Sequence, residues 1–149
     1  ELNQEGLDVL STQIDVSGAN LKIFPNRLAV SDTDNEEIFV GEASPSTTII
    51  ENLKEGSSVY TTKIDTYASK ANLEKIDFIK MDIEGAEIPA LIGASDSIAK
   101  FKPKLAISVY HKWDDLKEIP KLINSIRDDY EYYLDCTTGF GGEAVLYCK

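Results

Sequence analysis

The sequence predicts an α/β fold, and the prediction depends on the pattern of its C-terminal half. Two apolar, partly β-branched runs, Ile76–Met81 and Lys104–Tyr110, are typical of buried strands, and a helical pattern follows each of them. Two further apolar segments are Glu131–Cys136 and Glu143–Cys148. We expect them to be paired strands joined by a glycine-rich turn at 139–142. The order strand–helix–strand–helix–strand–strand indicates a mostly parallel sheet that ends in an antiparallel edge pair.

The other elements follow from local signals. In the C-terminal half, one helix is predicted from Ala86, with Pro89 in its first turn, and a second is predicted to begin near Pro120. Leu21–Val30 is rich in β-forming residues but is interrupted by Pro25. The remaining N-terminal predictions are an amphipathic helix over 2–13, strands at Glu37–Val40 and Ser58–Ile64, and a short helix Thr66–Lys70 with Asp65 as its N-cap.

Composition limits the class of protein. The 149 residues are 42% hydrophobic, which predicts one domain over residues 1–149 with a real core. A net charge of −11 argues against nucleic-acid binding, which needs clustered Lys and Arg. No apolar run reaches the ~20 residues of a membrane span, and no signal peptide is visible. We therefore expect a cytoplasmic protein without a membrane partner, in which Cys136 and Cys148 are buried thiols and no metal is bound.

Candidate chemistry gathers where the two buried strands end. Asp82 and Glu84 follow the first strand, and if that strand continues through Ile83 both carboxylates point to one side. Ligands of open α/β sheets bind beyond the carboxyl ends of the strands. Glu87 is expected mainly to complement the dipole of the following helix.

His111 is the only histidine, and it follows the second strand directly, which places it at the same sheet edge as Asp82. Either residue is suited to take a proton from a hydroxyl group, because an imidazole titrates near pH 6.5 and a carboxylate can act as a general base. The alternative for His111 is a hydrogen-bonded histidine at a strand end. Tyr110 beside it is expected to pack rather than to take part in chemistry.

Several stretches resemble the FkbM-type methyltransferases, which use S-adenosylmethionine and mostly methylate hydroxyl groups. The stretches are DFIKMDIEGAE, PALIGASDSI, KPKLAISVYHKWDDLKEIPKLI and the terminal EAVLYCK. The resemblance implies a Rossmann-like sheet, S-adenosylmethionine as cofactor and a hydroxyl of a small molecule or glycan as acceptor. It implies that Asp82 lies near the methionine end of the cofactor and the acceptor, that Glu1 binds the ribose, and that Ser31 and Asp32 flank the adenine. With the residues at the strand ends, the expected catalytic residues are Asp82 and His111, and the expected cofactor-binding residues are Glu1, Ser31, Asp32, Asp82 and Glu84.

The chain also departs from that family's pattern. No glycine-rich cofactor loop precedes Ile76, and the similar-looking Asp15–Asn20 follows a helical pattern, so it is expected to be a plain turn. We therefore expect a sheet that lacks its first two strands, and an isolated chain that is inactive and binds S-adenosylmethionine poorly. A non-catalytic α/β interaction module remains the alternative. Because the first strand, which would pair with the strand at 76–82, is expected to be absent, that strand needs a new neighbour. The candidates are Leu21–Val30 and a second copy of the chain in a homo-oligomer.

Overall fold

The computed structural model describes residues 24–40, 57–136 and 143–149. The chain divides into two compact units, the first made of residues 1–29 and 35–61 and the second of residues 30–34 and 62–149. The single domain expected from the length stays a prediction. The expectations for the helix over 2–13, the turn at 15–20, the turn at 139–142 and Glu1 lie outside the described residues.

A small sheet forms around β3 (Ser57–Thr62). Strand β2 (Glu37–Val40) pairs with it antiparallel, with Glu37 opposite Tyr60 and Val40 opposite Ser57. Strand β1 (Ala29–Val30) lies on the other side of β3, so the order is β1-β3-β2. The predicted second strand of this sheet therefore ends at Thr62, because the chain already enters a helix at Ile64.

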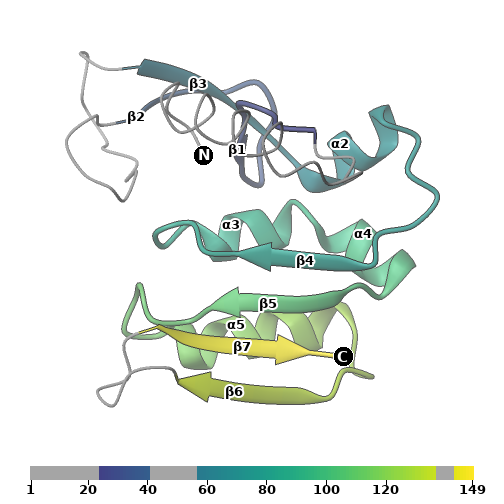
Figure 1. The fold of residues 1–149 in the computed structure, drawn as a ribbon, viewed down its shortest axis with the longest axis vertical. Helices are drawn as coiled ribbons and strands as arrows, with labels where there is room; N and C mark the ends of the chain where they lie inside the picture. The colour runs from purple at the N-terminus through teal and green to yellow at the C-terminus, as the bar shows by residue number, and fades with distance from the viewer. Residues whose placement is uncertain (1–23, 41–56, 137–142) are drawn as a thin grey trace, which may run out of the picture. The chain divides into compact units, whose positions relative to one another are not determined.

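The second unit is built on a four-stranded sheet in the order β4-β5-β7-β6 (Figure 1). Its strands are β4 (Phe78–Met81), β5 (Lys104–Ser108), β6 (Tyr132–Cys136) and β7 (Ala144–Cys148). Strands β4 and β5 are parallel, and β7 runs antiparallel to both β5 and β6. The predicted antiparallel C-terminal pair is confirmed, but the last strand inserts between β5 and β6 and so lies inside the sheet.

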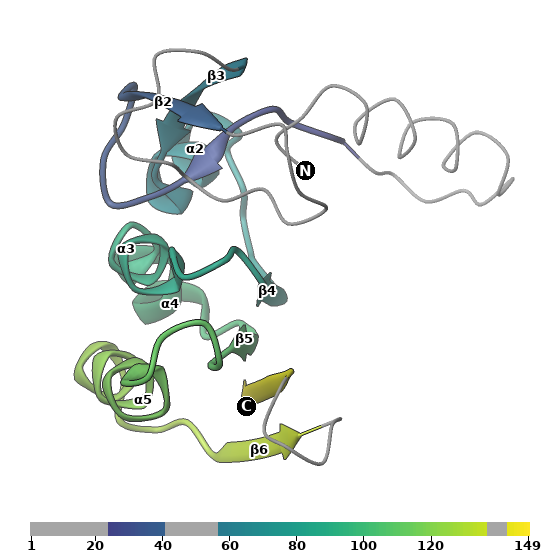
Figure 2. The ribbon, with the colours of Figure 1, turned by 90° about the vertical axis from the view of Figure 1, so that its left-hand side faces the viewer.

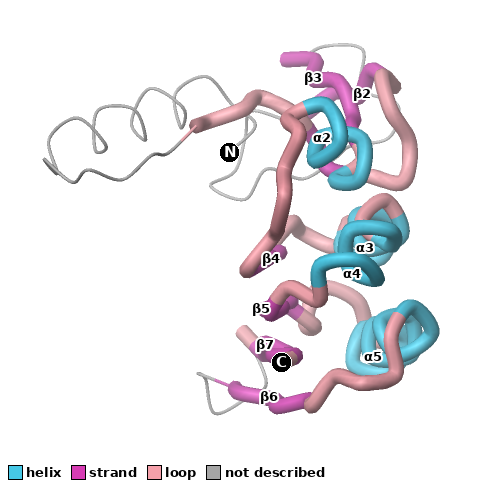
Figure 3. Tube along the Cα trace, turned by 90° about the vertical axis from the view of Figure 1, so that its right-hand side faces the viewer, coloured by secondary structure: helices cyan, strands magenta, loops and turns pink. Residues whose placement is uncertain are grey.

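Among the described residues, four helices complete this unit: α2 (Ile64–Lys70), α3 (Glu87–Ile92), α4 (Ser95–Phe101) and α5 (Asp115–Ile126). Helices α3, α4 and α5 lie on one face of the four-stranded sheet, as Figures 2 and 3 show from opposite sides. The apolar side chains of β4 and β5 on that face, such as Met81, Leu105 and Ile107, are at most 2% exposed and form the core with Leu91 and Ile98. Burial of each such side chain contributes about 1.5–3 kcal/mol, so this face holds the unit together.

Helix α5 begins at Asp115, five residues before the predicted start at Pro120. Asp115, Ile119 and Ile123 are spaced by four residues and are at most 1% exposed, so they form one continuous buried stripe. Pro120 lies inside the helix, where it removes one N–H donor. The packing of the buried stripe outweighs the loss of this hydrogen-bond donor. The rule that places proline in the first turn therefore predicted the wrong first residue for α5.

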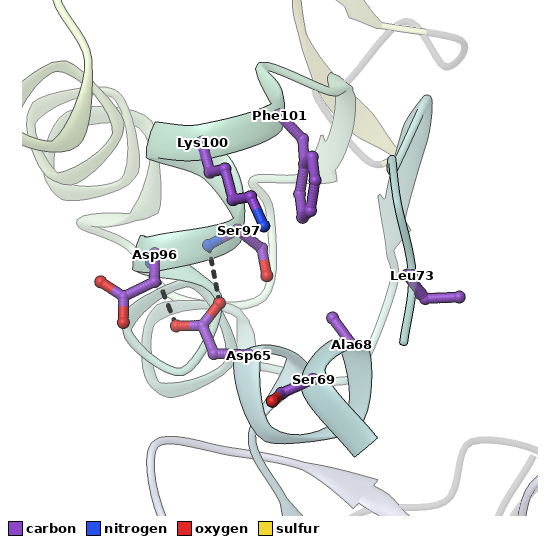
Figure 4. Close-up of a pocket in the computed structure, with 8 residues that line it drawn as sticks. All are labelled: Asp65, Ala68, Ser69, Leu73, Asp96, Ser97, Lys100 and Phe101. Carbon is purple, nitrogen blue, oxygen red and sulfur yellow. Dashed lines mark hydrogen bonds between the residues drawn. The ribbon is translucent and has the colours of Figure 1, made fainter. Parts of the chain in front are cut away.

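Asp65 is not the N-cap of its own helix. Helix α2 begins at Ile64, and Asp65 lies within it. Its carboxylate instead accepts hydrogen bonds from the amides of Asp96 (3.0 Å) and Ser97 (2.8 Å), in the first turn of α4 (Figure 4). A neighbouring helix therefore supplies the cap of α4, a contact that local sequence rules do not reveal.

The two cysteines differ in environment. Cys148 in β7 is buried, and burial raises its thiol pKa to about 12. Cys136 is exposed, so the expectation of two buried thiols is wrong for this residue. The reason is its position at the end of β6, an edge strand whose last four residues are exposed.

Strand β4 lies at one edge of its sheet in the described part of the chain. The proposal that Leu21–Val30 pairs with it is wrong for the described residues of that segment, because β1 pairs with β3. Pairing of β4 with a second copy stays a prediction. Among the described helices, none combines the length and the apolar character that crossing a membrane requires.

Candidate active site

Asp82 is the first residue after β4, and three polar side chains surround its carboxylate. Ser108 at the end of β5 donates a hydrogen bond of 2.8 Å, and the Tyr110 hydroxyl donates one of 3.1 Å to the same oxygen. Lys80 Nζ lies 3.2 Å from the other oxygen. Partial burial raises the pKa of Asp82, but the hydrogen bonds, led by that from Ser108, outweigh it and the net pKa is lowered. Asp82 is therefore a carboxylate at neutral pH.

The chain turns sharply after Asp82. Glu84 (φ 56°) and Gly85 (φ 91°) both adopt the left-handed conformation, so the strand does not continue through Ile83 as expected. A Cβ atom at Gly85 would lie 3.2 Å from Cε of Lys112 and 3.7 Å from Cβ of His111. Glycine thus meets two needs, the positive φ angle and the close approach of this turn to the segment after β5.

Carboxylates of this turn lie close to His111, as its position at the same sheet edge predicts. Its side chain is 10% exposed, and its Nε2 lies 3.5 Å from Glu84 Oε2 and 3.8 Å from Asp82 Oδ1. Neither contact is a hydrogen bond in the described part of the structure. Tyr110, expected only to pack, stacks on the imidazole at 4.2 Å between ring centroids and also binds Asp82.

Glu87, expected mainly to complement the helix dipole, also belongs to this site, and Ser108 is a residue of the site that the sequence analysis did not single out. Glu87 is 1% exposed, and its Oε1 accepts a hydrogen bond of 3.0 Å from the Ile83 amide. The same Oε1 lies 3.0 Å from His111 Nδ1. Its place in the first turn of α3 fits the predicted complement to the helix dipole, but that interpretation does not account for a buried contact with the imidazole. The available signal was the spacing of three acids within six residues of a strand end.

The junction after β5 repeats the arrangement after β4. Asp115, also 1% exposed, accepts a hydrogen bond of 2.7 Å from the Lys112 amide, three residues earlier. After each strand comes a turn in which one backbone amide donates a hydrogen bond to a buried acid of the following helix. The two turns carry Asp82 and His111, so their relative position is set by well-packed local structure.

Ser31 and Asp32, implied to lie beside the adenine, lie next to Gly93 at the C-terminal end of α3, and their part in cofactor binding stays a prediction. The Ser31 carbonyl lies so close to Gly93, just after α3, that a Cβ there would come within 2.0 Å of it. The Asp82–His111 group instead lies at the start of α3, a helix of six residues and therefore about 9 Å long. Ser31 Oγ donates to Asp32 Oδ1 at 3.2 Å. The structure therefore unites Asp82, Glu84 and His111, but it does not bring Ser31 and Asp32 to them.

A pocket of about 240 Å³ lies elsewhere on the second unit, between α2 and α4, and Figure 4 shows the eight residues that line it. They are Asp65, Ala68, Ser69, Leu73, Asp96, Ser97, Lys100 and Phe101. Small-molecule sites usually enclose about 300–1,000 Å³, so this pocket is small for a cofactor. Across the described ranges, no three His, Cys, Asp or Glu side chains are arranged to hold a metal ion.

Fold and site together define an α/β protein with an acidic, histidine-containing group at the carboxyl ends of two parallel strands. A model of the FkbM methyltransferase domain matches residues 15–132, which is most of the chain. The chain therefore belongs to the FkbM methyltransferase family, as its sequence motifs indicate.

Two relatives support this assignment. Over 94 residues, 60% of this chain and 37% of the relative, the sequence is 42% identical to the 2-O-methyltransferase NoeI of Sinorhizobium fredii (strain NBRC 101917 / NGR234). The crystal structure of the methyltransferase FkbM from Methylobacillus flagellatus KT matches all of this chain with a TM-score of 0.74 and 27% identity. The chain covers 35% of that structure, so it spans little more than a third of the length of either relative.

Proposed function

We propose that this chain carries the acceptor side of an S-adenosylmethionine-dependent O-methyltransferase that acts on a hydroxyl group of a small molecule or sugar. The observation that carries the proposal is the gathering of Asp82, Glu84 and Glu87 around His111 at the ends of β4 and β5. Family membership supports methyl transfer, and the similarity to NoeI, a 2-O-methyltransferase, favours oxygen as the acceptor atom.

The carboxylates of the site fit S-adenosylmethionine, which is positively charged at its sulfonium and ammonium groups. Asp82 is an accessible carboxylate with its side chain 39% exposed, and Glu84 beside it is 36% exposed. When bound, the cofactor supplies an electrophilic methyl group. These two acids would hold a cationic or hydroxyl-bearing partner next to the imidazole.

Of the two proposed bases, His111 is the one whose ring nitrogens, both buried, have no hydrogen-bond partner among the described residues. An acceptor hydroxyl would give its proton to Nε2 while its oxygen would form a bond to the methyl group. The S–CH3 bond of the sulfonium would break, and the neutral thioether S-adenosylhomocysteine would leave. Asp82 already accepts hydrogen bonds from Ser108 and Tyr110, and its lowered pKa makes it a weak base. Its proposed role is to orient the acceptor and stabilise the imidazolium that forms.

The proposal is tested with labelled S-adenosylmethionine and a panel of sugar and small-molecule alcohols, using a protein that contains this chain. Asp82→Ala should reduce methyl transfer by about 100-fold or more while the circular dichroism spectrum is unchanged. Asp77→Ala is the matched control, because Asp77 is an exposed acid of the same chain segment, paired with Lys75. Equal rates in the two variants would contradict the proposal.

A second measurement concerns the 149-residue chain by itself. We expect it to bind S-adenosylmethionine poorly, because no glycine-rich loop with backbone donors for the methionine portion of the cofactor is recognisable in its sequence. Calorimetric titration should show no saturable heat in the micromolar range. A micromolar dissociation constant would show that the described acids and their neighbours suffice for binding.

A further inference from the structure

Glu87 has a role beyond holding a turn. We propose that it is a positioning residue that keeps the proton of neutral His111 on Nδ1, which leaves Nε2 as the proton acceptor beside Asp82 and Glu84. The inference deepens the proposed function and rests on it for the use of Nε2. The position of the proton, however, is a property of the chain that is measured without any reaction.

The distances single out Glu87 among the groups around the imidazole. Its Oε1 lies 3.0 Å from Nδ1, whereas the two acids near Nε2 are 3.5 and 3.8 Å away and are partly exposed. The Nδ1 contact has the length of a hydrogen bond but not yet its alignment. Polar contacts in unliganded active sites are often misaligned and tighten when the site is filled.

Holding the turn does not explain why residue 87 is charged. The bond from the Ile83 amide needs only one neutral acceptor, which a glutamine would also provide. A carboxylate that is 1% exposed is expensive unless a donor or a positive charge compensates it. Its Oε2 has no hydrogen-bond partner among the described residues, so the imidazole is the group that accounts for the charge.

The other described neighbours of the imidazole do not compete for Nδ1. Tyr110 stacks on the ring, and its hydroxyl is bound to Asp82. Lys80 pairs with Asp82, and the Lys112 side chain lies against Gly85. Because the hydrogen bond at one ring nitrogen decides which nitrogen carries the proton, Glu87, whose Oε1 lies 3.0 Å from Nδ1, would set the tautomer once this contact aligns.

A single histidine makes this testable by nitrogen-15 NMR, since every imidazole signal of the chain belongs to His111. A titration first finds the pH range in which the ring is neutral. There the wild-type chain should show mainly the Nδ1–H tautomer. In Glu87→Gln the ratio of Nδ1–H to Nε2–H should fall about fivefold, because a charged acceptor binds a donor roughly twice as strongly as a neutral one.

Asp115→Asn is the matched control. Asp115 is equally buried and holds the neighbouring turn in the same way, and asparagine keeps an acceptor for the Lys112 amide. Its tautomer ratio should equal that of the wild type. A purely structural role for Glu87 predicts similar small changes in both variants.

Two results would overturn the inference: a wild-type ring that is mainly Nε2–H, or an unchanged ratio in folded Glu87→Gln. The first result needs no variant, so a variant that fails to fold does not remove the test. A protein that shows the expected tautomer but no methyl transfer would confirm the positioning role and reject the proposed function, so the two failures are distinguishable.

Discussion

Replacing Asp65 with alanine should destabilise the second unit through a helix other than its own. The Asp65 carboxylate accepts hydrogen bonds from the amides of Asp96 and Ser97, and Ser97 is 4% exposed. Loss of a helix cap costs about 0.5–2 kcal/mol, and a buried donor left without a partner costs about 1–3 kcal/mol. We expect a loss of about 2 kcal/mol in the free energy of unfolding, or about 4–8 °C in Tm for a chain of this length.

Urea unfolding followed by circular dichroism measures this change, provided that the slope m is unchanged. Asp96→Ala is the matched control. Asp96 is an exposed acid in the first turn of α4, and its substitution removes the same charge as Asp65→Ala does. Its loss should cost only the dipole contribution of about 0.3–1 kcal/mol. A loss in Asp65→Ala no larger than that in Asp96→Ala would refute the capping argument.

Three further predictions concern other parts of the chain. Hydrogen bonds from the Lys63 amide and the Thr66 hydroxyl hold the pKa of Asp34 below its usual value of 3.8. The Asp34 carboxylate therefore contributes its full stabilisation above pH 3.8, and this contribution is lost as the pH falls through the lowered pKa. Asp34→Asn should therefore weaken the acid dependence of unfolding, and an unchanged pH profile would reject this. At pH 8 a thiol reagent should label Cys136 quickly and Cys148 only after unfolding, and rapid labelling of both thiols would show that Cys148 is accessible. If β4 pairs with a second copy, sedimentation should show a dimer that Ile79→Pro disrupts more than the control Glu74→Pro does, and a strictly monomeric chain would contradict the pairing.

The sequence was most informative where a local pattern and the packing agree. The strand before Asp82, the helix with Pro89 and the strand before His111 all have apolar positions that the core uses. Consequently, the meeting of Asp82 and His111 at one sheet edge could be predicted from the parallel pairing of two buried strands.

What could not be predicted depends on contacts between distant residues or on side-chain direction in turns. The positive φ angles of Glu84 and Gly85 redirect the chain after Asp82, and no periodicity encodes that change. The partner of Glu87 lies 24 residues further along the chain. In the same way, Asp65 carries the local signature of an N-cap, but the helix that it caps is supplied by tertiary packing.

The role proposed for His111 is tested by measuring the rate of methyl transfer and the cofactor affinity separately in His111→Ala, in a protein that contains this chain. If Nε2 of His111 removes the proton of the acceptor hydroxyl, kcat should fall by about 10²–10⁴-fold while the dissociation constant for S-adenosylmethionine changes little. Equal turnover in His111→Ala and the wild type would contradict the account and return His111 to the role of a hydrogen-bonded residue at the end of a strand.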